Sequence, residues 1–513
     1  MAIETISTTL EEMEQNVVQF TKDLFKATAA GREYQFEKGI YRYLPLMPTK
    51  ALKSALSIER EILTLITSFD DLQARTITVI KNLLRANSDR YEKSIMLVVH
   101  SDKRGGSKLK NWGRENGYTI LSIYYRDILD GENAKDLLNN ELFNQDPFDI
   151  TGPVSSESEF FGRRDEAISF SRKIQRGSIN SVLGLRKTGK TSIINRVTAE
   201  CNDKYADFIL FIDCSRDEVW SLDSNKLLKT IYANIKDAKQ NEVFYQSLVS
   251  TREFSPISIE SIVSAIDLSD KQVILIFDEF DYITPSSPTN QNIWSEQFNQ
   301  FWRQMRVVYQ EICRRKRNLS IVLCGVTSKW FSVTEINGIE NAAVSLVPEE
   351  YLRPLQENAV MAMVKALGNR CGLSFDKKAL ETIYNGTSGI PSWIRKFCSY
   401  INRKVPIENR PTEVTGDFVN QLLNDYTFGE GISYSKVAID HLFTVYPEVR
   451  ISVSKFIDDP SKLSPNERLL LNSYGISNAK NGFTGKVMKE TIDGSSAESV
   501  VEVGFRQLAK LMI

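Results

Sequence analysis

The sequence predicts an α/β protein whose central part is a doubly wound parallel sheet with helices on both faces. Five short apolar runs alternate there with helical stretches, at 179–184, 207–213, 272–281, 319–325 and 343–347. Runs that are apolar along their whole length are typical of parallel strands buried on both faces. From about residue 355 to 425 the pattern turns wholly helical. We therefore expect an α/β core followed by a helical unit.

Composition restricts the class of protein before any motif is considered. The chain has 513 residues, 42% of them hydrophobic and 25% charged, and a net charge of −1. Such values are ordinary for globular proteins, and the length suggests about three or four domains. A net charge near zero provides no global basic field to recruit nucleic acid. Six cysteines without a C-x-x-C pair and two histidines argue against a zinc site or a disulfide framework.

Targeting signals are not visible in the sequence. The first 30 residues lack a long apolar core, and no apolar run approaches the ~20 residues needed to cross a bilayer. We therefore expect a reduced, cytoplasmic protein without a membrane partner.

Residues 1–143 are predicted to form an N-terminal α/β domain. Helices are expected at 4–28, 51–67 and 70–87, and strands at 94–101 and from 118 onward. The strand-helix-strand part loosely resembles half of a restriction-endonuclease-like fold. Metal-dependent cleavage needs an acid and a closely spaced carboxylate-x-lysine pair, and this region lacks a convincing one. We expect a degenerate domain of that kind or an unrelated interaction domain, without nuclease activity.

A glycine-rich loop follows the first strand of the central part. The stretch GLRKTGKT matches G-x-x-x-x-G-K-[ST] and lies between a strand and a helix. Its two glycines let successive backbone N–H groups turn inward, and the helix start adds the positive end of its dipole. Lys190 should reach the β- and γ-phosphates, and the Thr191 hydroxyl should ligate Mg²⁺. The predicted ATP-binding residues of the loop are Gly184, Leu185, Arg186, Lys187, Thr188, Gly189, Lys190, Thr191 and Ser192.

An acidic pair follows the apolar strand at 272–281. Asp278 would reach the carboxyl end of that strand beside the loop and join Thr191 as a metal ligand. Glu279 would orient and deprotonate the attacking water. The sequence thus predicts Mg²⁺-dependent ATP hydrolysis, with Glu279 and Lys190 as the catalytic residues.

With these motifs, residues 145–425 resemble the AAA+/STAND group of P-loop ATPases. The resemblance is strongest to the branch near origin-recognition ATPases and bacterial and archaeal regulatory or defence ATPases. Four further motifs support it: EFFGRRDE at 159–166, LSIVLCGVTS at 319–328, YLRPLQENAV at 351–360 and TSGIPSWIRKF at 387–397. The resemblance implies a P-loop ATPase core at 144–354 and a helical lid at 355–426, with ATP between them.

The resemblance also implies roles for individual residues outside the loop. The adenine side of the pocket would be lined by Phe161, Gly162 and Arg163. Ser328 or Thr327 would contact the γ-phosphate, although the usual sensor asparagine and the Thr-Arg of other STAND proteins are both missing. Arg395 would be the lid arginine that reads the phosphate state, and a solvated helical arginine is the alternative.

Two places in the sequence are candidates for an arginine finger. The basic run at 313–318 ends a predicted helix, where cations favour the helix dipole, so we expect it to be a solvated surface. Arg353, beside the last predicted strand, is the second candidate.

Residues 427–513 are predicted to be a small mixed or helical C-terminal domain, with a winged helix as one option. They contain equal numbers of acidic and basic residues, which does not favour a nucleic-acid surface. For the whole chain, the resemblance implies an ATP-hydrolysing molecular switch in regulation or anti-phage defence, assembled with itself or a protein partner. The alternatives are a DNA-binding ATPase of origin-recognition or transposition type and a scaffold that holds ATP without turnover.

Overall fold

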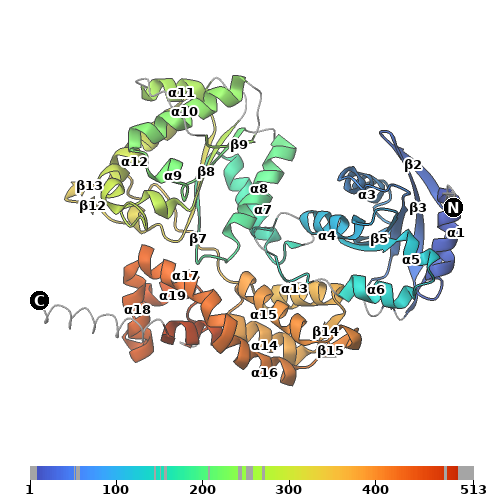
Figure 1. Cartoon of the computed structure of the whole chain (residues 1–513). Coiled ribbons are helices and arrows are strands. Elements are labelled where there is room, and N and C mark those ends of the chain that lie inside the picture. Colours follow the sequence, from blue (N-terminus) through green and yellow to red (C-terminus); the bar gives the residue numbers. More distant parts are fainter. Residues whose placement is uncertain are drawn as a thin grey trace, which may run out of the picture.

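The computed structural model describes residues 9–50, 52–53, 58–143, 146–150, 152–154, 159–205, 208–240, 245–249, 258–267, 272–478 and 482–494. In Figure 1 the N-terminal sheet lies on the right, the central sheet at the upper left, and the helices of the C-terminal half below. Within the described residues no helix has both the length and the apolar character that a bilayer span requires.

The N-terminal part is built on a six-stranded sheet of order β1-β3-β4-β5-β6, with β2 paired to β3. Its strands are β1 (Phe25–Ala27), β2 (Arg32–Phe36), β3 (Gly39–Pro48), β4 (Glu61–Ile66), β5 (Tyr91–His100) and β6 (Thr119–Tyr124). Its helices are α1 (Leu10–Thr21), α3 (Arg75–Ala86), α4 (Gly105–Asn116), α5 (Tyr125–Leu129) and α6 (Ala134–Phe143). The expected β-α-β unit is confirmed as β5-α4-β6, whose two strands pair in parallel.

One helix predicted in this part is wrong. The range 51–67 contains β4, whose residues are buried on both faces of the sheet after Glu61. A short apolar run of this kind has no period that separates a buried strand from a helix, so the spacing was misleading.

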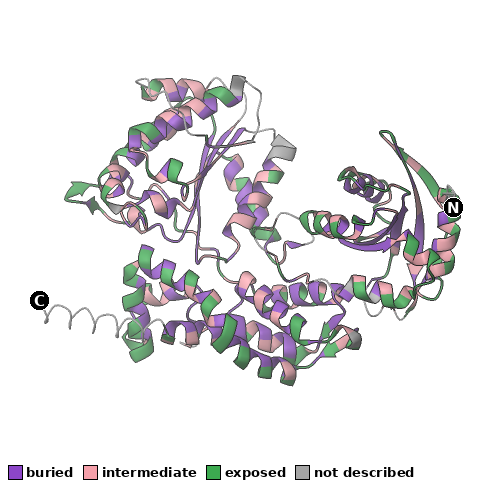
Figure 2. Cartoon of the chain, viewed as in Figure 1, coloured by how far each residue is buried: buried purple, intermediate pink, exposed green. Residues whose placement is uncertain are grey.

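The central part is a five-stranded sheet of order β7-β11-β10-β8-β9 in which every pair is parallel. Its strands are β7 (Ile179–Leu183), β8 (Phe208–Asp213), β9 (Tyr245–Ser247), β10 (Val273–Asp278) and β11 (Leu319–Gly325). Helices on its two faces are α7 (Arg164–Gln175), α8 (Lys190–Tyr205), α9 (Asp217–Trp220), α10 (Ser224–Gln240), α11 (Ile259–Asp267) and α12 (Gln291–Arg314). Strands β10 and β11 are buried along their whole length, as Figure 2 shows for the sheet. The predicted α/β class is confirmed.

The last predicted strand of this sheet is wrong. Residues 343–347 form turns, because Ser345 has a left-handed φ of 58° that an extended strand does not allow. The fifth strand is instead the short β9. The chain returns beside β7 only at Tyr351, in a single parallel bridge to Leu183. The segment between β10 and Tyr351 also contains two short 3-10 helices, η2 (Phe280–Ile283) and η3 (Lys329–Phe331). A small hairpin of β12 (Glu335–Ile336) and β13 (Ile339–Glu340) follows them.

The C-terminal half is helical apart from one small pair of strands. Its elements are α13 (Glu357–Arg370), β14 (Leu373–Phe375), α14 (Lys377–Thr387), α15 (Pro391–Lys404), η4 (Ile407–Asn409), β15 (Thr412–Val414), α16 (Gly416–Tyr426), η5 (Thr427–Gly431), α17 (Ile432–Val445), α18 (Pro447–Asp458), η6 (Pro460–Lys462) and α19 (Pro465–Ser473). One hydrophobic core includes buried residues of this half from Leu355 to Ile492, together with Phe148, Leu185 and Val326. The predicted lid and C-terminal domain therefore share a core, and η5 joins α16 to α17 without an intervening loop.

The winged-helix option stays a prediction. The described residues after 431 contain α17, α18 and α19, a further helical stretch at 486–494, and one antiparallel bridge between Ser477 and Phe483. Residues 495–513, which belong to the same predicted domain, lie outside the described part of the chain.

Candidate functional site

The glycine-rich loop joins the end of β7 to the start of α8. Gly184 has a φ of 144° and Gly189 a φ of 97°, which are values that other residues rarely adopt. A Cβ at Gly184 would also meet the Leu352 carbonyl oxygen at 3.1 Å. The loop therefore needs glycine at its first position for both backbone angle and space.

Lys190 is folded back into this loop. Its Nζ donates to the carbonyl oxygens of Gly184, at 2.9 Å, and Leu185, at 3.0 Å. The side chain is buried, and the Thr188 hydroxyl donates to the same Leu185 carbonyl at 2.8 Å. The ammonium is thus held inside the loop by neutral acceptors, and phosphate oxygens would bind it more strongly.

Thr191 and Asp278 lie side by side, although 87 positions separate them in the sequence. The Thr191 hydroxyl donates to Asp278 Oδ2 at 3.3 Å. Burial raises the pKa of Asp278, because the charged carboxylate is poorly solvated there. A hydroxyl and a partly desolvated carboxylate are oxygen ligands of the kind that Mg²⁺ prefers, so these residues fit the ion.

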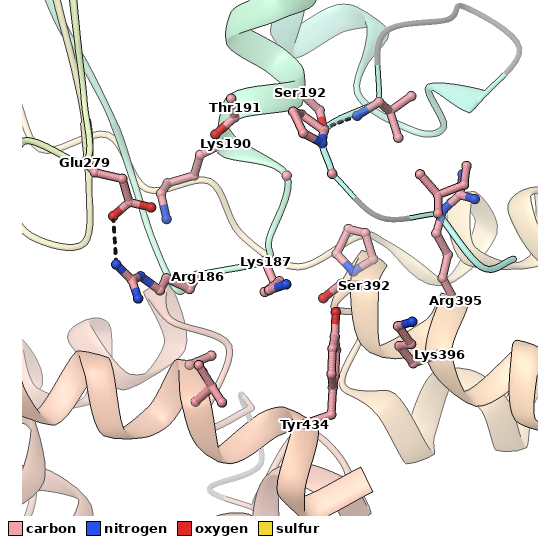
Figure 3. A pocket seen from close by; sticks show the side chains of 18 residues that line it. Arg186, Lys187, Lys190, Thr191, Ser192, Glu279, Ser392, Arg395, Lys396 and Tyr434 are labelled. Carbon is pink, nitrogen blue, oxygen red and sulfur yellow. Dashed lines mark hydrogen bonds and ion pairs between the residues drawn. The ribbon is translucent and has the colours of Figure 1, made fainter. Parts of the chain in front are cut away.

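Glu279 lies at the end of β10 with a φ of 50°. A non-glycine residue in this region is uncommon and is concentrated at functional sites. The Arg186 guanidinium lies 3.6 Å from Glu279 Oε2 and donates to the Tyr282 hydroxyl at 3.1 Å. Figure 3 shows the Arg186 and Glu279 side chains directed toward each other at the edge of a cavity.

This cavity has a volume of about 540 Å³ and lies between the central sheet and the helical half. Volumes of about 300–1,000 Å³ are typical of small-molecule and cofactor sites. One wall is the glycine-rich loop, the second is α15 with Pro391 and Ser392, and the third is α17 with Tyr434. A nucleotide bound here would contact the glycine-rich loop, α15 and α17.

The residues expected on the adenine side are not among the described residues that line the cavity. Arg163 is buried and donates to the Thr188 carbonyl at 3.0 Å and the Arg353 carbonyl at 2.8 Å, so it braces the loop from behind. A Cβ at Gly162 would lie 2.3 Å from the Ala359 Cβ, which packs this turn against α13. Phe161 packs against the core of the helical half. The apolar lining on this side comes from Ile150, Pro153 and Val154.

The sensor strand ends away from the lining. The Ser328 hydroxyl is buried and donates to Glu349 Oε1 at 3.2 Å. Thr327 accepts from the Lys329 backbone through its hydroxyl at 3.1 Å. Both hydroxyls already have protein partners, and contact with a γ-phosphate stays a prediction for either.

Arg395 lines the cavity, but its guanidinium is held in an ion pair. It pairs with Glu159 Oε2 at 2.7 Å, and Arg370 binds the other oxygen of the same carboxylate. All three side chains are buried. The alternative of a solvated helical arginine is therefore wrong.

Two further groups at the site were not found from the sequence. Asp281 is fully buried, accepts from the Val326 backbone at 2.6 Å and the Thr327 backbone at 3.4 Å, and burial raises its pKa to about 7. His441 on α17 stacks near Tyr282, and burial with nearby Arg186 and Lys190 lowers its pKa to about 3.

Little in the sequence pointed to Asp281 or His441. Asp281 is the last residue of IFDEFD, and the side chains at 434, 438 and 441 follow helical spacing on α17. The ligand atoms of Glu279, Asp281 and His441 lie within 4.8 Å of one another. Because Arg186 already supplies a positive charge at Glu279, we assign no metal to that group.

Comparison with known proteins adds only distant structural likeness. No model of a protein family matches the sequence, and neither does any curated protein. A Walker-type ATPase of Pyrococcus abyssi is similar at 15% identity and a TM-score of 0.42, over 68% of this chain and 99% of that one. The RuvB Holliday junction branch migration motor of Thermotoga maritima is similar at 11% identity and a TM-score of 0.32, over 66% and 90%. The Aeropyrum pernix Orc1 protein, solved in complex with DNA, is similar at 12% identity and a TM-score of 0.32, over 67% and 94%.

Proposed function

We propose that the chain binds ATP with Mg²⁺ in the cavity between the central sheet and the helical half and hydrolyses it. The observation that carries the proposal is the contact of Thr191 with Asp278 at 3.3 Å. This contact brings the end of a glycine-rich phosphate loop to the carboxyl end of an apolar strand. The acid that follows on that strand, Glu279, also lines the cavity. Phosphate cradle, metal ligands and base therefore lie at one site.

The described side chains have distinct tasks in this reaction. The loop N–H groups and Lys190 hold the β- and γ-phosphates. Thr191 and Asp278 would hold Mg²⁺, which supplies charge neutralisation at the phosphates when bound. Glu279 accepts a proton from the attacking water, and the bond between the γ-phosphorus and the bridging oxygen breaks to give ADP and phosphate.

We infer further that nucleotide occupancy acts as a switch. The Tyr434 ring lies 5.3 Å from Lys187 Nζ and 5.8 Å from Lys396 Nζ, so α17 is in contact with both other walls of the cavity. The C-terminal helices also touch the end of the sensor strand, where Tyr474 donates to the Val326 carbonyl at 3.0 Å and Lys329 pairs with Glu448 at 2.7 Å. A ligand that moves one wall of the cavity should therefore shift the positions of the other two walls. A role in regulation or anti-phage defence, with assembly through copies of the chain or a protein partner, is supported by the sequence motifs alone.

Two variants test the activity. Lys190→Ala should lose ATP affinity, because it removes the cation inside the phosphate loop. Glu279→Gln should keep ATP affinity and lose turnover, because the amide cannot accept the proton. Fluorescent ATP binding and phosphate release measure the two effects. Unchanged binding by Lys190→Ala, or unchanged turnover by Glu279→Gln, would contradict the proposal.

A DNA-handling role is distinguished by one further measurement. Duplex DNA that stimulates ATP turnover, with binding that weakens steeply as salt rises, would favour a DNA-dependent ATPase. Turnover that duplex DNA does not change would favour a switch that acts on a protein.

A further inference from the structure

The second residue after Gly184 in the glycine-rich loop is an arginine whose side chain faces the catalytic acid. Arg186 lines the cavity, and its side chain is 26% exposed. It belongs to the loop whose backbone N–H groups would cradle the phosphates of a bound triphosphate. Figure 3 shows its guanidinium between Glu279 and α17.

The contacts of this guanidinium are incomplete. The 3.6 Å separation from Glu279 Oε2 exceeds the ~2.7–2.9 Å of a charge-assisted hydrogen bond. Within the described part of the chain, Arg186 Nε and Glu279 Oε2 are both buried atoms without a hydrogen-bond partner. An unsatisfied buried polar atom is unfavourable, so both atoms are suited to a further hydrogen-bond partner. An oxyanion beside Arg186 and a water molecule beside Glu279 would satisfy both atoms.

The other cations of the cavity are already engaged. Lys190 donates to loop carbonyls, Arg395 pairs with Glu159, and Lys396 pairs with Asp149 at 2.7 Å. Lys187 lies against the Tyr434 ring. Arg186 therefore differs from the other four cations, because its ionic partner is the expected base itself.

The other candidates for an arginine finger are not among the described residues that line this cavity. Arg315 pairs with Glu260 at 2.8 Å and with Asp267 at 3.1 Å, and Arg317 pairs with Asp267 at 3.3 Å. These pairs join the end of α12 to α11 at the surface. Arg353 lines a different cavity, between the core and α18–α19.

We propose that Arg186 is a catalytic residue that acts in cis on the γ-phosphate. This inference rests on the proposed ATP hydrolysis. Arg186 faces Glu279, and with ATP bound its guanidinium binds a γ-phosphate oxygen while the Glu279 carboxylate binds the water. The water oxygen then bonds to the γ-phosphorus, the bond to the bridging oxygen breaks, and Glu279 takes the proton. Arg186 stabilises the charge on the transferred group, and no second subunit supplies an arginine.

The first test separates catalysis from binding. Arg186→Ala should lower kcat by about 100-fold or more, since removing one such charge-stabilising group typically costs that much. Its dissociation constant for ATP should change by less than about tenfold, because the contact strengthens in the transition state. Arg186→Lys, which keeps the charge and should fold, should also retain less than about a tenth of kcat, because an ammonium lacks the planar fork. Arg315→Ala is the matched control, and its kcat should equal that of the unmodified chain.

A second measurement excludes a purely structural effect. ADP with aluminium fluoride imitates the transferred phosphoryl group, and the unmodified chain should form a long-lived complex with it. Arg186→Ala should lose this complex while it still binds ATP. Normal trapping by Arg186→Ala would overturn the assignment.

A mixing experiment distinguishes action in cis from action in trans. Arg186→Ala and Glu279→Gln each remove one catalytic group, and a finger in trans would let a mixed assembly build one intact site. In cis no site is intact, so the mixture should stay inactive. Recovered turnover in the mixture, or wild-type kcat in Arg186→Ala, refutes the inference and leaves ATP hydrolysis standing. Absence of turnover in the unmodified chain refutes the proposed function and the inference with it.

Discussion

Glu159 forms a charge cluster with two arginine side chains, and substitutions in this cluster should change the free energy of unfolding by different amounts. One carboxylate faces two guanidiniums, those of Arg370 and Arg395, and all three residues are buried. Glu159→Gln keeps the shape but removes the negative charge that both guanidiniums bind. Breaking a buried pair in this way costs about 3–5 kcal/mol. Arg395→Met removes one cation and keeps the pair of Glu159 with Arg370, so it should cost much less.

The loss of stability should be largest in α13, α15 and the turn before α7, because the cluster joins these segments. Urea unfolding gives the free energy, and hydrogen exchange measured peptide by peptide shows whether α15 opens first. Asp417→Asn is the matched control, because the Lys378–Asp417 pair has side chains 66% and 85% exposed and should contribute less than about 1 kcal/mol. If Glu159→Gln is no more destabilising than Arg395→Met or Asp417→Asn, the charge argument is refuted.

Two further predictions follow from the titration of the buried histidines and from the metal ligands. Burial lowers the pKa of His100 to about 4 and that of His441 to about 3, so the folded state keeps both rings neutral. Their stabilising contribution is complete above the unfolded pKa of 6.5 and is lost as pH falls below it, by about 2 kcal/mol for each ring at pH 5. His441→Asn should remove its share of the pH dependence between pH 7.5 and 5 in urea unfolding, and an unchanged pH dependence would contradict the assignment. Thr191→Ala removes one oxygen ligand and should raise the Mg²⁺ concentration for half-maximal ATP turnover by about tenfold or more, whereas Thr191→Ser should leave it near normal. An Mg²⁺ titration of phosphate release measures both variants, and equal midpoints would argue against Thr191 as a ligand.

The sequence could predict the parts of the site that parallel-sheet geometry fixes. Lys190 follows β7 and Asp278 ends β10, and the carboxyl ends of parallel strands meet at one edge of a sheet. Their proximity therefore followed from two motifs without any knowledge of the helices. The prediction of a strand at 343–347 was wrong for a local reason. Ser345 has a left-handed φ that interrupts an extended strand, and an apolar sequence pattern does not reveal backbone angles.

The roles that depended on long-range packing could not be predicted in the same way. Arg395 was expected to read the phosphate state or to be a solvated helical arginine, and only the structure shows that Glu159, 236 positions earlier, binds it. Ser328 or Thr327 was expected to contact the γ-phosphate, which stays a prediction, and only the structure shows that the Ser328 hydroxyl bonds to Glu349. In both cases the motif specifies a residue type, whereas its partner depends on where a distant segment folds.

The third wall of the cavity has a consequence for how the chain works as a unit. Helix α17 places Tyr434 against the phosphate loop and His441 beside the residues that follow β10, while its other side belongs to the core that runs from Leu355 to Ile492. A rotation of α17 would therefore have to move the helices packed with it, because close-packed cores shift between discrete arrangements and do not deform continuously. Occupation of a cavity bordered by this helix changes the balance between such arrangements only if ATP and ADP contact α17 differently. The γ-phosphate is the group that differs between them. If it binds Arg186 as we propose, the loop arginine would link hydrolysis to the position of the C-terminal helices, because its guanidinium also faces α17.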